Sequence, residues 1–482
     1  MFVAGENCWR VERADRMTVI VDADEYFRAA REAFLLAKRR IMLVGWDFDA
    51  RIRLTGGPRE PGEPEQIGEF LHWLVERNPA LELYLLRWDV GAVKSLFRGT
   101  TVFTVLKWMR HPRIHTKLDH HHPTAASHHQ KIVSIDDCLA FCGGIDMTGD
   151  RWDTRGHLDD EPGRRQPNGR PYKPWHDATS ALAGPVAAAL GEACRDRWAR
   201  AAGERLAPIE GEAGCWPAML RPSFEDVAVA IARTHPAMAD QKAVHEVEAL
   251  FLAQIAAARR FLYCESQYFA SRRIAEAIAR RLDEPDGPEI VIVNPVTAQG
   301  WLEPVAMDTA RARLMAALRA RDRHGRLRLY HPHTEGGGPI YVHAKISIVD
   351  EALLRIGSAN MNNRSLRLDT ECDVAVAAGG DPARARTIAA IRDDLLAEHL
   401  GVPAARVAAT LARSGSLIAT IEELRGPGRT LVPYEIPDLT AVEAWLADNE
   451  VLDPEGPGEL FEPLSRRSLF RRLRRPPAPA VA

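Results

Sequence analysis

Two short motifs of the same form carry the residues best suited to catalysis. They are His129-x-Lys131-x4-Asp136 and His343-x-Lys345-x4-Asp350. Because His and Lys are two residues apart, a strand would place both side chains on one face. On such a face, a Lys would neutralise the negative charge that grows on a phosphodiester in its transition state. A neutral His would attack phosphorus, and a protonated His would donate a proton to the leaving oxygen.

The duplication of the motif has a chemical reason. One histidine cannot act as nucleophile and as acid in the same step, so two copies predict a single site with one His from each. The same requirement for one neutral and one charged imidazole predicts a bell-shaped pH profile. We expect Asp136 and Asp350 to be structural, since each lies seven residues after its His, where the strand alternation turns the side chain to the opposite face.

The segments that follow the two motifs also agree with each other. Gly143 and Gly357 each lie 14 residues after their His, and Asp146 and Asn360 each lie 17 after. Glycine at such a position permits close approach of the backbone, and the polar side chain would contact a phosphate oxygen or the Lys. Between them stand Gly144 in the first copy and Ser358 in the second.

The predicted elements around the motifs occur in the same order twice. In each half of the chain, helices alternate with apolar strand-like runs. The expected helices are 23–40, 65–77, 101–110, 245–260, 271–282 and 305–322, and the expected strands are 41–49, 81–89, 127–137, 261–269, 289–295 and 341–350. This order predicts an α/β fold of two similar halves, with sheets covered by helices.

Several segments resemble the phospholipase D superfamily, in particular its longer phospholipid-acting members. They are SHHQKIVSIDD, GGIDMTGDRWDT, PWHDATSALAGPV, CESQYF and VHAKISIVDEALLRIGSANMNNRSLRLDTE. The resemblance covers roughly residues 30–400 and lacks the family's regulatory lipid-binding domains. It implies two α/β halves related by a pseudo-twofold axis, with one active site at their interface. It also implies a two-step mechanism through a phosphohistidine, without metal or other cofactor.

The resemblance assigns roles to single residues. It implies that one motif histidine is the nucleophile and the other the general acid. We take His129 as nucleophile and His343 as acid, although the sequence alone does not order them. Lys131, Lys345 and Asn360 match positions that bind the phosphate. Asp146 stands where many members carry Asn, and we interpret it as a residue that positions Lys131.

Each catalytic His also needs a partner on its other ring nitrogen. Glu371 in the DTE segment and Asp153 in the RWDT segment match family positions for such carboxylates. For His176 and Asp177 of the PWHD segment, a structural role under the site fits better than a second acid/base pair.

Residues at the ends of predicted strands are candidates for binding the headgroup or an acyl chain. They are Trp46, Trp88 and Tyr268. Trp175 of the PWHD segment is a candidate for the mouth of the site, and Glu265 and Gln267, which resemble the family's E-x-Q segment, are candidates for hydrogen bonds to a headgroup. Arg364 follows Asn360 closely and is a candidate for positive charge near the phosphate. For Arg364, a surface salt bridge is an equal alternative.

Composition limits the location and the partners. The net charge of −3 gives no global basic field, so no nucleic-acid partner is expected. No apolar run is long enough to cross a bilayer, and the first residues have no signal-peptide core. The seven cysteines are irregularly spaced, which favours free buried thiols. We therefore expect a cytoplasmic protein, with peripheral contact at the inner membrane surface as an option.

A metal site is not expected. The histidines at 120–122 and 128–129 form a dense run near the first motif. Consecutive residues cannot all point to one ion, so exposed loop histidines are the better interpretation.

The predicted reaction is cleavage of a glycerophospholipid into phosphatidate and a headgroup alcohol, with water or another alcohol as acceptor. The alternatives are a cardiolipin synthase-type phosphatidyltransferase, a nuclease of the same superfamily and an inactive membrane-binding scaffold. A monomer is expected, because one chain completes the site. The expected parts are residues 1–220 and 221–400 as the two halves, 401–464 as a helical or irregular region, and 465–482 as a basic, flexible tail.

Overall fold

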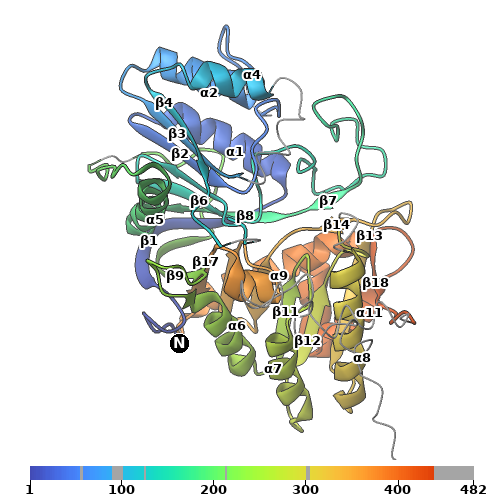
Figure 1. The fold of residues 1–482 in the computed structure, drawn as a ribbon. Helices are drawn as coiled ribbons and strands as arrows, with labels where there is room; N and C mark the ends of the chain where they lie inside the picture. Colours follow the sequence, from blue (N-terminus) through green and yellow to red (C-terminus); the bar gives the residue numbers. More distant parts are fainter. Residues whose placement is uncertain (55–57, 90–100, 124–125, 212–213, 300–303, 439–482) are drawn as a thin grey trace, which may run out of the picture.

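The computed structural model describes residues 1–54, 58–89, 101–123, 126–211, 214–299 and 304–438. The predicted basic tail lies outside these residues. One 16-stranded mixed sheet runs through the molecule, in the order β18-β13-β12-β11-β15-β16-β17-β9-β1-β8-β6-β5-β2-β3-β4, with β10 (Val244–His245) paired to β9. A second, two-stranded sheet joins β7 (Trp175–His176) to β14 (Tyr341–Val342). Helices cover the large sheet (Figure 1), so the α/β prediction is confirmed.

Two long antiparallel strands, β1 (Arg10–Val21) and β9 (Phe224–His235), lie at the centre of the large sheet. From this pair towards either edge, the strands follow with the same senses of pairing. On one side are β8 (Ala178–Ala183), β6 (Leu139–Gly143), β5 (Ile132–Ile135), β2 (Arg40–Gly45), β3 (Glu82–Trp88) and β4 (Ile114–Asp119). On the other are β17 (Glu371–Ala377), β16 (Leu353–Gly357), β15 (Ile346–Val349), β11 (Phe261–Glu265), β12 (Glu289–Val293), β13 (Leu327–His333) and β18 (Thr430–Pro433). Further from the centre, β2 pairs with β3 and β11 pairs with β12, and both pairs are parallel. Parallel neighbours need a crossover connection, which a helix supplies in each half.

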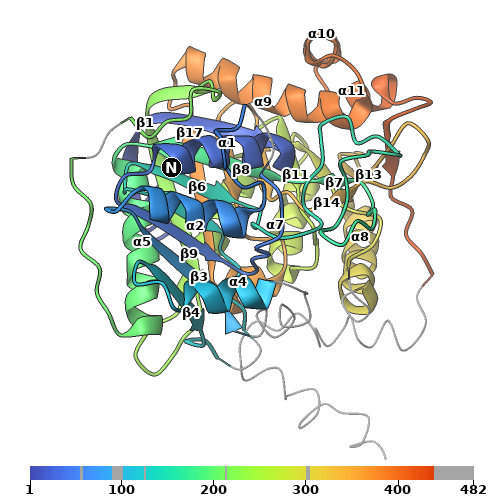
Figure 2. The same ribbon diagram turned by 90° about the horizontal axis from the view of Figure 1, so that it is seen from above.

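The helices form a layer on each face of the sheet (Figures 1 and 2). One layer holds α1 (Ala23–Leu36), α2 (Ile67–Arg77), α4 (Thr101–Trp108), α6 (Glu246–Ala257), α7 (Arg272–Asp283) and α8 (Thr309–Arg321). The other holds α5 (Pro185–Ala202), α9 (Pro382–Leu400), α10 (Ala404–Ser414) and α11 (Leu417–Leu424). Short π-helical turns occur at Pro304–Asp308 and Arg364–Leu368.

The predicted helices follow from the spacing of their apolar residues. In α1, Ala23, Tyr26, Phe27, Ala30 and Phe34 repeat at intervals of three or four and are all buried. The predicted helices before each parallel strand are present, and each ends where a short turn leads into its strand. The strands β2 and β11 are shorter than expected, because the chain leaves the sheet at Gly45 and at Glu265.

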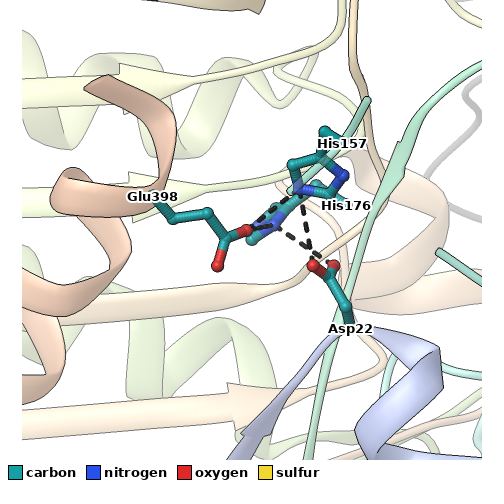
Figure 3. Close-up of side chains that lie close together, drawn as sticks. All are labelled: Asp22, His157, His176 and Glu398. Atoms are coloured by element: carbon teal, nitrogen blue, oxygen red, sulfur yellow. Dashed lines mark hydrogen bonds and ion pairs between the residues drawn. The ribbon is translucent and has the colours of Figure 1, made fainter. Parts of the chain in front are cut away.

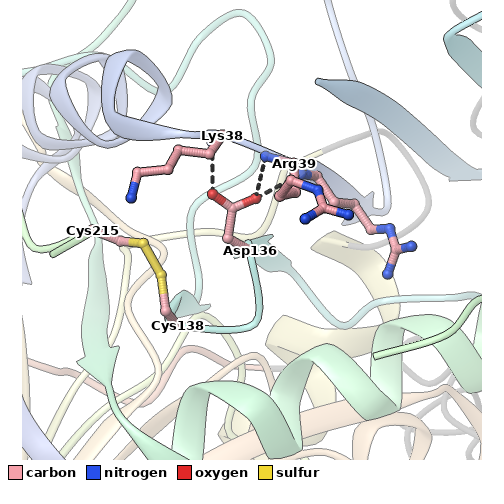
Figure 4. The surroundings of a disulfide bond; sticks show 6 residues. Lys38, Arg39, Asp136, Cys138 and Cys215 are labelled. Atoms are coloured by element: carbon pink, nitrogen blue, oxygen red, sulfur yellow. Dashed lines mark hydrogen bonds between the residues drawn. A yellow bond between two sulfur atoms is a disulfide. The ribbon is translucent and has the colours of Figure 1, made fainter. Parts of the chain in front are cut away.

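The cysteines correct one prediction. Cys138, in the turn between β5 and β6, forms a disulfide with Cys215, which is 77 residues away (Figure 4). Cys8, Cys142, Cys194, Cys264 and Cys372 are free and buried, as expected. The prediction of free thiols is therefore wrong for one pair. Since disulfides are rare in reducing compartments, the cysteines no longer support a cytoplasmic location.

Candidate active site

The two motif aspartates hold the backbone of the preceding helix–strand turn. Asp136 adopts φ 49° and accepts hydrogen bonds from the backbone N–H groups of residues 38, 39 and 40, at 2.7, 2.8 and 2.6 Å (Figure 4). Asp350 adopts φ 52° and accepts from residues 259, 260 and 261, at 2.9, 2.8 and 2.7 Å. Each carboxylate thus fixes the start of a parallel strand, which is a structural contact.

The histidines and lysines of the motifs lie just outside the strands. His129 and Lys131 precede β5, and His343 and Lys345 lie between β14 and β15. The prediction that they stand on a strand is therefore wrong by a few residues. Both segments are instead held by the opposite half of the chain. His129 N donates to Thr370 O at 3.0 Å, and His343 N donates to His176 O at 2.7 Å.

Each imidazole is held at Nδ1 by a carboxylate from the opposite half. His129 Nδ1 lies 2.9 Å from Glu371 Oε1, and His343 Nδ1 lies 2.6 Å from Asp177 Oδ2. Both carboxylates are fully buried. Glu371 is thus where the sequence predicted a partner of a histidine. Asp177 was missed, because its place beside the second motif depends on the short β7–β14 pairing, which the sequence does not reveal.

Asp153 does not contact either motif histidine. Its carboxylate accepts from Arg164 Nη1 at 3.1 Å and from Trp175 N at 2.8 Å, and it lies 3.1 Å from His157 Nδ1. The prediction that Asp153 orients a catalytic His is therefore wrong. The residue ties the loop over 153–175 together beneath the site.

The first lysine has a carboxylate partner. Lys131 Nζ donates to His129 O at 2.6 Å and forms an ion pair with Asp146 Oδ2 at 3.2 Å. The other oxygen of Asp146 accepts from Trp46 N at 3.1 Å. Asp146 therefore lies between the first lysine and the carboxyl end of β2.

The second lysine is less strongly neutralised. Lys345 Nζ donates to the backbone oxygen of His343 and lies 3.4 Å from Gln267 Oε1. Burial, together with the charge of Lys131, lowers the pKa of Lys345 to about 7. In the free protein, this ammonium is close to losing its proton at neutral pH.

The electrostatics of the histidines follow from the same crowding of positive charge. Burial lowers the pKa of His129 well below its ordinary value, and Lys131 and Lys345 add to this effect. Burial and Lys345 lower the pKa of His343 in the same direction, against the opposing effect of Asp177. The pocket therefore favours neutral imidazoles until an anion enters it.

The two glycines of the flanks are required by packing. A Cβ on Gly143 would lie 2.4 Å from Thr179 Cα, and a Cβ on Gly357 would lie 2.5 Å from Asp373 Cα. Gly144 leaves room for the carboxylate of Asp177, because a Cβ there would lie 2.3 Å from Oδ1. At the equivalent place in the second copy, Ser358 Oγ donates to Glu371 Oε2 at 2.5 Å. Both residues thus support the carboxylates that hold the histidines.

Asn360 is buried, and its Oδ1 lies 3.5 Å from Ser266 Oγ.

The predicted aromatic residues occupy two places. Trp46 stacks on Trp88 at 5.8 Å, at the carboxyl ends of β2 and β3. Trp175 is buried, stacks on Tyr341 at 4.6 Å and lies 5.1 Å from the ring of His343.

The remaining predicted substrate contacts differ in accessibility. Gln267 Nε2 donates to Tyr341 Oη at 2.8 Å and to Tyr268 Oη at 3.0 Å, beside Lys345. Arg364 is half-buried and pairs with Asp369 at 2.8 Å. Glu265 is fully buried and its oxygens bind His176, His399 and Tyr263. The prediction that Glu265 binds a headgroup is therefore wrong, because no part of it is accessible.

Beneath the site lies a buried cluster of Asp22, His157, His176 and Glu398 (Figure 3). Glu398 Oε1 lies 3.0 Å from His157 Nε2 and 2.7 Å from His176 Nδ1. The other ring nitrogens lie 3.1 Å from Asp153 and 2.7 Å from Glu265.

This donor set has the composition of a metal site. However, the carboxylates outweigh burial and raise the pKa of His157 to about 9 and that of His176 well above its ordinary value. The four N–H groups of two such imidazolium ions all meet carboxylates, and their two charges offset those of Asp22 and Glu398 within the cluster. We therefore interpret the cluster as an ion-pair network that joins α1, the 153–177 segment and α9.

The histidine run near the first motif is only partly exposed. His120 is exposed, whereas His122 lies 2.9 Å from Asp89 and His128 lies 3.1 Å from Asp119. Arg197 pairs with Asp119 as well, at 2.6 Å. The prediction of exposed loop histidines is therefore wrong for His128, which is buried.

The family of the chain follows from comparison with family models. The model described as "Phospholipase D" matches residues 33–275, and the model described as "Cardiolipin synthase, PLD-like domain" matches residues 251–388. The chain belongs to the phospholipase D superfamily. The two models together cover both histidine motifs.

Curated relatives are similar to this superfamily member over most of its length. Phospholipase D alpha 1 of Arabidopsis thaliana is 25% identical over 77% of the chain, and phospholipase D A of Dictyostelium discoideum is 23% identical over 82%. The chain spans 63% of the first relative and 36% of the second.

A solved structure shares the fold. The phosphatidylserine synthase of Haemophilus influenzae Rd KW20 aligns with a TM-score of 0.54 at 13% identity, over 81% of this chain and 88% of that one. Among the described residues, no helix has the length and apolar character needed to cross a membrane.

Proposed function

We propose that this superfamily member is a phospholipase D-type phosphodiesterase that removes the headgroup from glycerophospholipids. One observation carries the proposal: each motif histidine is oriented at Nδ1 by a carboxylate from the opposite half of the chain. A proton on Nδ1 leaves Nε2 of each ring as the reactive nitrogen. Two such nitrogens beside two lysines are what a two-step displacement at phosphorus requires.

The two carboxylates support a division of labour. Burial raises the pKa of Glu371 to about 7, so a smaller fraction of Glu371 than of Asp177 is ionised at neutral pH. Burial would also raise the pKa of Asp177, but His343 and Lys345 outweigh it and lower the pKa to about 2. A firmly ionised Asp177 stabilises an imidazolium at His343. We therefore assign His343 as general acid and His129 as nucleophile.

In the first step, Nε2 of His129 attacks phosphorus, a P–N bond forms and the P–O bond to the headgroup breaks. The proton of His343 passes to the departing alkoxide, so the headgroup leaves as an alcohol. In the second step, water attacks phosphorus and returns a proton to His343, while the P–N bond breaks. The products are phosphatidate and the headgroup alcohol.

The pocket supplies charge for both steps. Lys131 and Lys345 neutralise the non-bridging oxygens as charge grows on them, and Asn360 donates from its amide. An entering phosphodiester also raises the pKa of Lys345 and of both histidines. Substrate binding thus prepares the acid that the first step consumes.

Transfer to an alcohol is the second candidate. The cardiolipin synthase-type model matches residues 251–388, and the structural neighbour is named a phosphatidylserine synthase. The same phosphohistidine yields a phosphatidyl alcohol whenever an alcohol replaces water. Hydrolysis and transfer therefore differ only in the acceptor of the second step.

The test measures choline and phosphatidate release from phosphatidylcholine vesicles, with and without a primary alcohol. Wild type, His129→Ala and His343→Ala are compared with His324→Ala, a control at an exposed histidine. We expect release and a phosphatidyl-alcohol product from wild type and from the control, and loss in the two motif variants. Equal activity in all four proteins would refute the assignment.

No release from wild type would direct the test to phosphatidylglycerol and then to DNA and RNA. Cleavage of nucleic acid that depends on both histidines would replace the proposal with a nuclease. A transferase would give the phosphatidyl alcohol but little phosphatidate.

A further inference from the structure

The outer face of α4 and the turn at 109–110 that follows it carry a group of exposed apolar side chains. Phe103, Leu106 and Met109 are 71%, 46% and 65% exposed. Lys107 and Arg110 are exposed among them. The opposite face packs inwards, with Trp108 fully buried. We call the five exposed residues the α4 patch.

The charge around the α4 patch differs from that of the whole chain. Residues 101–118 contain Lys107, Arg110, Arg113 and Lys117 but no Asp or Glu, whereas the whole chain has 66 acidic residues and a net charge of −3. Lys117 and Leu118 are exposed on the edge strand β4, next in the chain. An acid-free basic stretch with apolar side chains fits an anionic surface with an apolar interior.

The α4 patch lies at the edge of the sheet that carries the site. Trp108 contacts Phe48 at 5.7 Å between ring centroids, and a Cβ added to Gly68 would lie 2.8 Å from Thr104 Cγ2 and 2.7 Å from Ala50 Cβ. Residues 48–50 follow the carboxyl end of β2, where Asp146 links Lys131 to Trp46. Figure 1 shows α4 beside α2 on the outside of the N-terminal half. The inner side of α4 therefore packs on the segment after β2, and the same segment holds Trp46, which contacts the partner of Lys131, Asp146.

We propose that the α4 patch docks the protein on an anionic phospholipid bilayer. The proposal rests on the proposed function, since a phospholipid substrate resides in such a surface and must be reached from the catalytic edge. Phe103, Leu106 and Met109 insert among the acyl chains, while Lys107 and Arg110 contact the anionic headgroups. Leu106 and Met109 have no ring on which a base could stack, and Phe103 is the one aromatic side chain of the patch, so a bilayer fits the patch better than a nucleic acid.

The test uses the full chain with Phe103, Leu106 and Met109 all replaced by Ser. Its matched control replaces Leu36, Val11 and Met219, which are 37%, 40% and 36% exposed elsewhere on the surface. A third variant carries Lys107→Gln and Arg110→Gln. Each is measured by co-sedimentation with vesicles of phosphatidylcholine alone or mixed with phosphatidylglycerol.

We expect the first variant to lose about tenfold or more of its partitioning onto both kinds of vesicle, because it loses three apolar anchors. The charge variant should lose partitioning only onto the mixed vesicles, and this effect should weaken with salt. The control should bind like wild type. Unchanged binding of the first variant, or an equal loss in the control, would overturn the proposal.

Turnover separates this inference from the proposed function. On a short-chain phospholipid that stays monomeric, the first variant should match wild type, whereas on vesicles its rate should fall with its binding. An equal loss on both substrates would overturn docking as the role of the patch. If wild type hydrolyses neither substrate, the vesicle-binding difference still decides the docking. Loss of binding to a DNA oligonucleotide with unchanged vesicle binding would assign the patch to nucleic acid and also overturn the proposal.

Discussion

Glu371 holds Nδ1 of His129 with its two oxygens at 2.9 and 3.0 Å, although 242 residues separate the pair in the sequence. This contact fixes which ring nitrogen carries the proton. For Glu371→Gln, we expect kcat to fall roughly 10²-fold or more, because the amide keeps an acceptor but loses the charge that supports the imidazole. Steady-state hydrolysis of phosphatidylcholine measures the change.

Asp153→Asn is the control for this prediction, since Asp153 contacts His157, Arg164 and the backbone of Trp175. It should lower the thermal midpoint while the kcat of the folded protein stays close to that of wild type. Asp177→Asn should behave like Glu371→Gln. A catalytic loss confined to Asp153→Asn would show that the contacts of Asp177 and Glu371 are not those used in catalysis.

The order of the two histidines can be decided with an activated substrate. A p-nitrophenolate leaving group needs no proton, so His343→Asn should still complete the first step and then stall, because no base activates water. We expect a burst of about one p-nitrophenol per site from His343→Asn and none from His129→Asn. Rapid mixing with an absorbance readout measures both.

Wild type serves as the control, with a steady rate and no stall. A burst from His129→Asn and none from His343→Asn would exchange the roles of the two residues. Linear, equal release from both variants would contradict a covalent intermediate.

Lys345 gives the site a pH dependence. Its pKa in the free protein is lowered to about 7, so the ammonium is present below this pH and is lost as the pH rises through it. An anion that binds to the ammonium should therefore bind more weakly above about pH 7, with an inhibition constant that rises towards about tenfold per pH unit. Sulfate is a suitable inhibitor, because it does not titrate in this range.

Gln267→Glu is the matched variant, because Gln267 Oε1 lies 3.4 Å from Lys345 Nζ. A carboxylate at this distance favours the ammonium and should move the transition to higher pH. If sulfate inhibits equally at all pH values in wild type, Lys345 does not control anion binding.

The sequence predicts the parts of the fold that have local signals. The parallel strands β2 and β11 are continuous apolar runs that follow amphipathic helices, so both could be located. The central strand β1 was missed, because Arg10, Glu12, Arg13 and Arg16 make its sequence look like a solvated surface segment. Arg13 and Arg16 are exposed and Arg10 and Glu12 are half-buried, whereas Ala14 and Met17 are buried.

The same limit applies to the site. The motif spacing locates His129 and His343, since it is a local pattern. Which carboxylate contacts which imidazole depends on long-range pairing, and this is why Asp153 was predicted in the place of Asp177. The pairing of Tyr341 with Trp175 brings Asp177 to His343, and a two-residue strand leaves no periodic signal.

The disulfide adds a stability test. Cys138–Cys215 closes a loop of 77 residues between the first motif and the linker that precedes β9. Because a closed loop restricts the unfolded chain, reduction should lower the free energy of unfolding by roughly 2–4 kcal/mol. Denaturation with and without a reductant measures the change. In Cys215→Ser the reductant should have no further effect, and an equal effect in that variant would assign the loss to another cause.

The buried cluster beneath the site makes stability depend on pH. The pKa of His157 is raised to about 9 by its carboxylate neighbours, against an ordinary value near 6.5. The stabilisation is therefore complete below about pH 6.5 and disappears as the pH rises through about 9. Asp22 acts in the opposite sense. Burial raises its pKa to about 6, so its charged form is a cost that is relieved as the pH falls through that value.

His157→Gln isolates the first of these effects. Below about pH 6.5, the variant should be less stable than wild type by roughly 2–3 kcal/mol, and this difference should shrink as the pH approaches about 10. Urea denaturation at several pH values measures it, with His324→Gln as the exposed control. Groups that titrate equally in wild type and variant cancel in the difference. A gap that stays constant over the whole range would mean that folding does not raise the pKa of His157, which would contradict the ion-pair interpretation of the cluster.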